Sequence, residues 1–168
     1  MKIEQVALTL YTLRNHCKTA ADYATTLKRV REIGYRAVQI SGLGPIPVEE
    51  VRSIAEGEGL VIAATHEPCA TILDQPESVA ERLEALGTRF TACPNAAGLD
   101  FGDLPQVEAF IAKLDHAGEV LRKAGKVLTY HNHSNEFYRL EGKTVLDRIY
   151  DGTRPENLQG EIDTYWVQ

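Results

Sequence analysis

A regular alternation of strand-like and helix-like segments is the feature that most constrains the fold of this chain. Runs rich in β-branched and aromatic residues begin near residues 5, 36, 60, 89, 127 and 158. The stretches between them place apolar residues at helical spacing, and the longest extends from Pro105 to Gly125. A strand followed by a helix about every 30 residues is typical of parallel strands joined by right-handed crossovers. The sequence therefore predicts a single α/β domain over residues 1–168.

Polar residues at the ends of the predicted strands distinguish two such architectures. An open doubly wound sheet often carries a glycine-rich phosphate loop in its first βα turn, and residues 13–18 contain no glycine. A (β/α)8 barrel instead builds one site from the C-terminal ends of many strands. Polar residues follow the strands at Tyr11, Arg14, Gln39, Ser41, His66, Glu67, Asn95, His131, His133 and Asp163. A full barrel has about 250 residues, so we expect an incomplete TIM barrel with about six βα units.

Composition narrows the classes of function. The formal net charge is −6, which counts against a nucleic-acid partner because such surfaces cluster basic residues. No run approaches the roughly 18 apolar residues of a membrane span, and the N-terminus lacks a long apolar core, which predicts a cytoplasmic protein. The chain has three cysteines, an odd number, and no Cys-x-x-Cys motif, so we expect reduced thiols.

Residues 130–137, Tyr-His-Asn-His-Ser-Asn-Glu-Phe, hold the densest group of metal-capable side chains. His131 and His133 are two residues apart and would share one face of a strand, where neutral imidazoles can bind a metal or move a proton. Glu136 and Asp163 offer the hard oxygen ligands that divalent metals prefer. We expect the strands that precede these residues to be neighbours, so that their ends share a site.

Three further residues are candidates for contacts with a substrate. His66 follows a strand of small and apolar residues, and we expect it to be a substrate contact or proton relay; the alternative is an ordinary loop histidine. Tyr11 and Arg14 could bind a hydroxyl or a phosphate, and Arg14 is otherwise a surface charge.

For two residues near the C-terminus, a place in the site competes with a purely structural role. Glu161 has the same strand parity as Asp163, but we expect it to pair with a neighbour such as Gln39 or an arginine. Trp166 could line a sugar pocket or belong to the core.

Two motifs resemble those of a known family. Residues 130–137 and the segment Asp-Thr-Tyr-Trp at residues 163–166 are similar to motifs of the xylose-isomerase-like TIM-barrel superfamily, especially its sugar phosphate isomerase/epimerase branch. Residues 8–14 and 64–68 resemble the first and third strands of that family. The resemblance covers nearly the whole chain.

The resemblance implies a divalent metal, such as manganese, magnesium, cobalt or zinc, and proton transfer between adjacent carbons of a sugar or polyol through an enediolate. By position, it makes Asp163 one metal ligand and Glu136 or His131 another. The proton would be carried by Glu136 or His66. We assign substrate binding to His131, His133, Tyr11 and Arg14. Ligands from a seventh and an eighth strand would fall beyond the last residue, so we expect half of the metal site and a chain truncated after strand six.

Two classes of function therefore remain open, and whether this chain is itself an enzyme is left undecided. The first is a metal-dependent isomerase or epimerase acting on a sugar, sugar phosphate or polyol, with a keto-inositol dehydratase-like lyase as a variant. The second is a catalytically incomplete barrel that folds as a homo-oligomer, because open sheet edges invite pairing with another chain. A phosphodiesterase of the apurinic-endonuclease branch fits the negative net charge less well.

Overall fold

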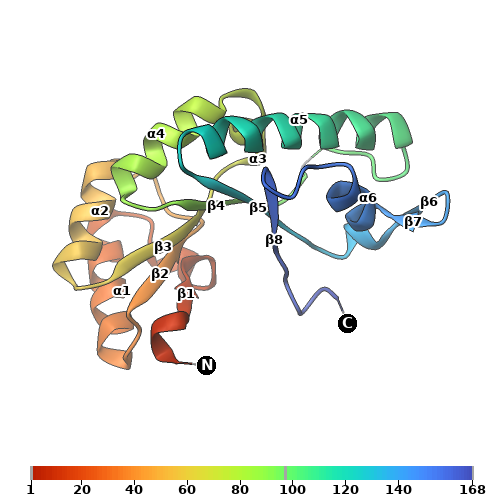
Figure 1. Cartoon of the computed structure of the whole chain (residues 1–168). Helices are drawn as coiled ribbons and strands as arrows, with labels where there is room; N and C mark the ends of the chain where they lie inside the picture. The colour runs from red at the N-terminus through yellow and green to blue at the C-terminus, as the bar shows by residue number, and fades with distance from the viewer. Residues whose placement is uncertain (1, 97, 168) are drawn as a thin grey trace. The chain divides into compact units, whose positions relative to one another are not determined.

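The computed structural model describes residues 2–96 and 98–167. It divides into two compact units, one formed by Met1–His66 with Glu81–Phe90 and the other by Glu67–Ala80 with Thr91–Gln168. Strands and helices alternate along the chain (Figure 1). The strands whose pairing is described in the main sheet run parallel. The predicted α/β class with about six strand–helix repeats is confirmed.

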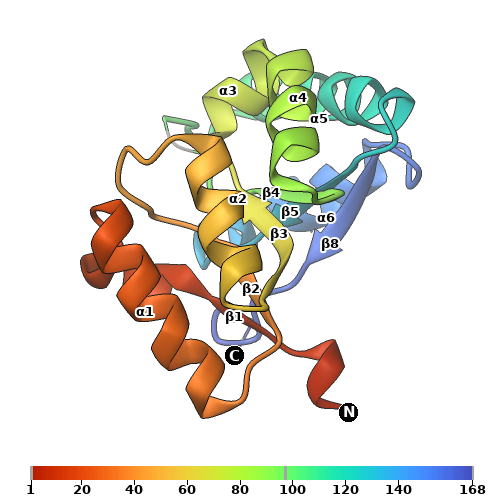
Figure 2. The ribbon, with the colours of Figure 1, turned by 90° about the vertical axis from the view of Figure 1, so that its left-hand side faces the viewer.

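The first unit packs helices on three parallel strands, in the order β1-β2-β3 (Figure 2). Its elements are η1 (Ile3–Gln5), β1 (Ala7–Thr9), η2 (Leu10–His16), α1 (Ala20–Ile33), β2 (Ala37–Ile40), α2 (Val48–Gly57), β3 (Val61–His66) and the second half of α4 (Pro76–Leu86). Helix α1 starts where the sequence predicts, because the Thr19 side chain accepts a hydrogen bond from the Asp22 amide, and it ends at Gly34 with φ +119°. Val38, Ile40 and Leu27 are buried between the helices and the strands.

The second unit carries the residues that the sequence analysis singles out near the C-terminus. Its elements are α3 (Cys69–Asp74), the start of α4, β4 (Phe90–Cys93), α5 (Leu104–Lys123), β5 (Val127–His131), η3 (Asn135–Phe137), β6 (Arg139–Leu140), β7 (Lys143–Thr144), α6 (Val145–Asp151) and β8 (Leu158–Glu161). The main strands follow the order β4-β5-β8. Helix α5 is capped by Asp103 and packs its apolar stripe, including Val107, Leu114 and Leu121, into the core.

A close approach between α5 and the segment that enters β8 fixes where that strand begins. A Cβ atom added to Gly118 would lie 2.1 Å from the Asn157 carbonyl oxygen, so only glycine permits this contact. The Asn157 side chain is buried and donates to the Asp115 carboxylate at 2.9 Å, while Arg122 donates to Asn157 at 3.0 Å. Helix α5 thus positions the start of β8 through backbone proximity and side-chain hydrogen bonds.

Asp115 also holds the turn before β8. It accepts hydrogen bonds from the Arg154 backbone amide at 2.8 Å and from the Arg154 guanidinium at 3.0 Å. Partial burial acts to raise the pKa of Asp115, but the hydrogen bonds from Arg154 and Asn157 outweigh it and hold this pKa below its usual value. The carboxylate therefore stays charged and keeps the turn attached to α5.

Replacing Gly118 with alanine is expected to destabilise the protein by about 2–3 kcal/mol, because backbone atoms must move to admit the new methyl group. Urea unfolding measures the change. Gly57→Ala is the matched control: it lies in α2, and no neighbouring atom would come within 4 Å of a Cβ added there, so alanine should leave stability equal or slightly higher. Equal stability of the two variants would contradict the close packing of α5 against Asn157.

The cysteine prediction is wrong for two of the three residues. Cys69, the first residue of α3, and Cys93, the last residue of β4, form a disulfide. Their separation of 24 residues gives no sign of this, because α3 lies outside the helices that periodicity predicts. Cys17 is a free, buried thiol whose pKa is raised by burial.

Among the described residues, no helix has the length and the apolar character that crossing a membrane requires.

Candidate functional site

The ends of β5 and β8 bring together the main candidates of the sequence analysis. The two strands are parallel neighbours, and their register places His131 opposite Glu161. The prediction that these strands are adjacent is confirmed. Asp163 follows β8 by two residues, so the carboxylates of Glu161 and Asp163 leave the same strand near the same histidine.

His131 lies between two carboxylates. Its Nδ1 is 3.4 Å from Glu161 Oε1, and its Nε2 is 3.5 Å from Asp163 Oδ2. The three side chains are 17%, 29% and 28% exposed, so the cluster is shielded yet open to a small ligand. Each ring nitrogen of His131 thus has one carboxylate beside it, and a histidine nitrogen with a carboxylate oxygen are donors that divalent metals take in proteins.

From the sequence, Glu161 is expected to pair with a neighbour such as Gln39 or an arginine, and not to belong to the site. Its contact with His131 follows from the β5–β8 register, which places the two residues directly opposite each other. The sequence shows which face of its strand Glu161 occupies. It does not show the register of β8 against β5, and that register is what places Glu161 beside His131.

Asn132 fixes the backbone of Asp163. The Asp163 amide donates to Asn132 Oδ1 at 2.9 Å, and Asn132 Nδ2 donates to the Asp163 carbonyl at 3.4 Å. Asn132 is fully buried, so these hydrogen bonds satisfy its amide. Asp163 Oδ1 in turn accepts a hydrogen bond from the Tyr165 amide at 2.9 Å. The carboxylate is therefore held at one oxygen, and its other oxygen faces His131.

Glu136 belongs to a buried hydrogen-bond network directly after β5. Its Oε1 accepts from the Tyr130 hydroxyl at 2.8 Å, and its Oε2 accepts from the His133 backbone amide at 2.8 Å. Glu136 is 1% exposed. Both oxygens thus secure the turn that carries His133.

The charge of this network affects two tyrosines. Burial, together with the charge of Glu136, raises the pKa of Tyr130 far above its ordinary value. Burial and the same charge raise the pKa of Tyr150 to about 12. The Tyr150 hydroxyl donates to the Tyr130 carbonyl at 3.4 Å. Both phenols therefore remain neutral donors at physiological pH.

Aromatic rings extend from the cluster along the end of the chain. The rings of His131 and His133 are 5.0 Å apart, and the His133 ring is 5.5 Å from that of Trp166. Tyr165 meets Trp166 edge to face at 4.8 Å. Trp166 is 36% exposed and Tyr165 is 70% exposed, so this row offers ring surface to solvent next to the carboxylates.

The remaining candidates lie in the first unit. His66 is the last residue of β3, and its Nδ1 is 3.1 Å from the Ser41 hydroxyl. Arg14 stacks on Tyr11 with 4.3 Å between the guanidinium carbon and the ring centroid, and donates to the Tyr11 carbonyl at 2.8 Å. The strand expected to begin near residue 5 is confined to Ala7–Thr9, and Tyr11 and Arg14 lie in η2.

Comparison with solved structures identifies proteins that share the fold of this chain. No protein-family model matches the sequence, and no curated protein matches it. A solved sugar phosphate isomerase/epimerase from Parabacteroides distasonis ATCC 8503 is similar over 99% of this chain and 68% of its own, with 21% identity and a TM-score of 0.85. A solved L-ribulose 3-epimerase is similar over 96% of this chain and 61% of its own, with 16% identity and a TM-score of 0.73.

A third structure connects the fold with a metal ion. A xylose isomerase-like TIM barrel protein from Mycobacterium smegmatis, solved in complex with magnesium, is similar over 79% of this chain and 57% of its own, with 16% identity and a TM-score of 0.59. The chain therefore has the fold of the sugar phosphate isomerase/epimerase and xylose isomerase-like TIM barrel proteins, as its sequence motifs predict.

Proposed function

We propose that this chain forms part of a metal-dependent isomerase or epimerase that acts on a sugar, sugar phosphate or polyol. The observation that carries the proposal is the position of His131 between Glu161 and Asp163 at the C-terminal ends of β5 and β8. Enzymes with barrel folds place their active sites at these strand ends. Solved proteins with this fold include a sugar phosphate isomerase/epimerase and an L-ribulose 3-epimerase.

One edge of the cluster offers two donor atoms that suit a divalent metal. Asp163 Oδ2 and His131 Nε2 are the proposed ligands, and Glu161, which lies at the other ring nitrogen, would orient the imidazole. Glu136 fits a ligand role less well, since each of its oxygens already accepts a buried hydrogen bond. When bound, the metal would polarise a substrate carbonyl and its neighbouring hydroxyl, which makes the adjacent carbon more acidic.

The protein's own residues would orient the substrate and move the proton. The rings of His133 and Trp166 provide a partly exposed surface on which the apolar face of a sugar can pack. His66 remains our candidate for proton transfer between the two carbons through an enediolate, on its position at the C-terminal end of β3. Tyr11 and Arg14 remain proposed contacts for a hydroxyl or phosphate.

Self-association is a second part of the proposal. Among the described strands, β8 pairs with β5 on one side only, and an open parallel edge can accept a strand from a second copy. A cytoplasmic location stays a prediction, and the Cys69–Cys93 disulfide argues against it because disulfides are rare in reducing compartments.

Metal content is the direct test of the proposed function. The full chain, loaded with Mn²⁺ and freed of excess ion by gel filtration, should retain stoichiometric manganese in elemental analysis. Incubation with ketoses in D₂O should then incorporate deuterium at the carbon next to the carbonyl, and EDTA should stop the exchange.

The absence of retained metal would instead favour the second candidate, a catalytically incomplete barrel. The chain covers 68% of the length of the sugar phosphate isomerase/epimerase to which it is similar. If the chain retains metal but shows no deuterium exchange, the proposed metal site is supported and catalysis by this chain alone is rejected.

A further inference from the structure

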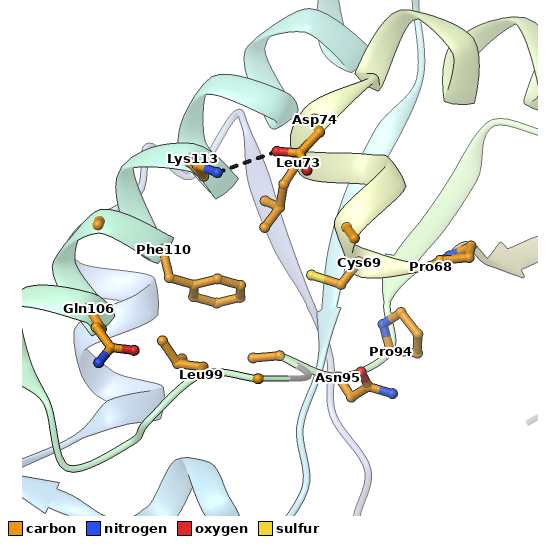
Figure 3. A pocket seen from close by; sticks show the side chains of 14 residues that line it. Pro68, Cys69, Leu73, Asp74, Pro94, Asn95, Leu99, Gln106, Phe110 and Lys113 are labelled. Carbon is orange, nitrogen blue, oxygen red and sulfur yellow. Dashed lines mark hydrogen bonds and ion pairs between the residues drawn. The ribbon is translucent and has the colours of Figure 1, made fainter.

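A pocket of about 540 Å³ lies between α3, α5 and the segment after β4 (Figure 3). None of its described lining residues belongs to the cluster at the ends of β5 and β8. Its walls are largely apolar and include Pro68, Leu73, Leu99 and Phe110. At one end, Lys113 and Asp74 form an ion pair at 3.3 Å. The pocket is large enough to admit a small molecule.

The Cys69–Cys93 disulfide borders this pocket on one sulfur only. Cys69 lines the pocket and is 8% exposed, and Figure 3 shows its sulfur directed toward the space beside Phe110 and Leu99. Cys93 is fully buried and is not among the lining residues. A reagent that enters the pocket can therefore reach Cys69 Sγ, whereas Cys93 Sγ is covered.

Among the described residues, few contacts besides the disulfide hold helix α3. Helix α3 has six residues and no side-chain cap at its N-terminus. Its ion pair to α5 joins two side chains that are each 61% exposed, and such pairs contribute little. Ile72 is the α3 side chain that is fully buried. The covalent bond at Cys69, the first residue of α3, is therefore a main restraint on the helix.

We propose that the Cys69–Cys93 disulfide is a thiol-exchange site, and that small thiols reach it through this pocket. A thiolate attacks Cys69 Sγ, the S–S bond breaks, and Cys93 leaves as a thiolate that takes up a proton. The result is a mixed disulfide on Cys69. A second thiolate then attacks the reagent's sulfur in this mixed disulfide and releases Cys69 as a thiolate that takes up a proton, which leaves two protein thiols and one disulfide of the reagent.

A hydrogen-bond acceptor for the reduced Cys93 thiol is already in place. Cys93 Sγ lies 3.5 Å from the Asn95 carbonyl oxygen, which can accept a hydrogen bond from the thiol formed on reduction. Opening the bond frees the start of α3 from the end of β4, so residues 69–74 gain mobility while β5 and β8 keep their pairing. This inference does not depend on the proposed isomerase function.

The test uses the full oxidised chain and reduced glutathione as the probe. Short incubation, alkylation and mass spectrometry should find glutathione on Cys69 and the alkylating group on Cys93. Complete reduction should speed hydrogen exchange of residues 69–74 by at least roughly tenfold, while residues 127–131 stay unchanged. Cys17→Ser should behave like the wild type, because Cys17 is buried outside the disulfide.

A pocket-filling variant tests the route. Ala109 is an exposed residue of α5 that lines the pocket, so Ala109→Trp should slow exchange with glutathione by roughly tenfold or more under native conditions and leave it unchanged in urea. Ala112→Trp, also exposed on α5 but outside this pocket's lining, is the control. Equal rates in both variants, glutathione on Cys93, or a chain without the disulfide after oxidation would each overturn the proposal.

Discussion

Replacing Asp163 with alanine is expected to weaken Mn²⁺ binding by more than about 100-fold. Loss of a hydrogen-bonding group next to a metal ligand already costs about 10- to 100-fold, and loss of a ligand should cost more. The side chain faces His131 with Oδ2, while its backbone is fixed separately by Asn132. The end of β8 should therefore keep its position in the variant. Competition with a fluorescent chelator measures the affinity.

Asp163→Asn separates the charge of the residue from its structural contact. The amide oxygen can still accept the hydrogen bond from Tyr165, which Asp163 Oδ1 accepts at 2.9 Å. We expect Asp163→Asn to lose metal almost as completely as Asp163→Ala, with unfolding midpoints near that of the wild type. Asp151→Ala is the control, since Asp151 forms an exposed ion pair with Lys143. Unchanged Mn²⁺ affinity in Asp163→Asn would remove Asp163 from the metal site.

Replacing Glu136 with alanine is expected to destabilise the protein by about 3–5 kcal/mol. The variant leaves the buried Tyr130 hydroxyl and the His133 amide without their acceptors, and each such loss costs about 1–3 kcal/mol. A cavity adds to the loss. Removing the charge also takes away one cause of the raised pKa of Tyr150, so this pKa should fall from about 12. Urea unfolding and spectroscopic titration of the tyrosines measure the two effects.

Glu136→Gln decides between a positioning role and a ligand role. Glutamine can accept from the His133 amide, and the Tyr130 hydroxyl can turn to accept from its NH₂ group, so most of the stability should return. If Glu136 only holds the turn, the glutamine variant binds Mn²⁺ like the wild type. If it is a metal ligand, as the family resemblance implies, metal binding is lost while stability is retained. Glu156→Ala, at an exposed position before β8, is the control.

The parts of the fold that follow from local periodicity were predictable. Helix α5 follows from a wide apolar stripe, and α6 follows from a capping box in which Thr144 and Asp147 bond each other's backbone. The pairing of β5 with β8 was expected from the polar residues that end both strands. These features depend on residues close in sequence, or on rules that hold for all parallel sheets.

The missed features depend on tertiary contacts. Helix α3 has six residues, too few for a periodic pattern, and its link to β4 joins cysteines 24 positions apart. The short hairpin of β6 and β7 lies in a segment to which the sequence analysis assigns no strand, and Gly142 takes φ +86° at its turn. Glu161 and Asn132 acquire their partners only through the register of β8. Sequence spacing indicates which strand end carries such residues, but it does not show which residues they contact.

The amide of Asn132 has a consequence for how the chain folds. Strand β8 has four residues, and a strand this short could slip by one position during folding at little cost in backbone hydrogen bonds. A slip would turn Asp163 to the opposite face of the sheet and bring Ile162 or Thr164 toward His131. Asn132 offers one donor and one acceptor to a single residue's backbone, that of Asp163, and so discriminates against the slipped pairing. Whether the Asp163 carboxylate faces the histidine is thus decided by competition between registers, before any ligand is present.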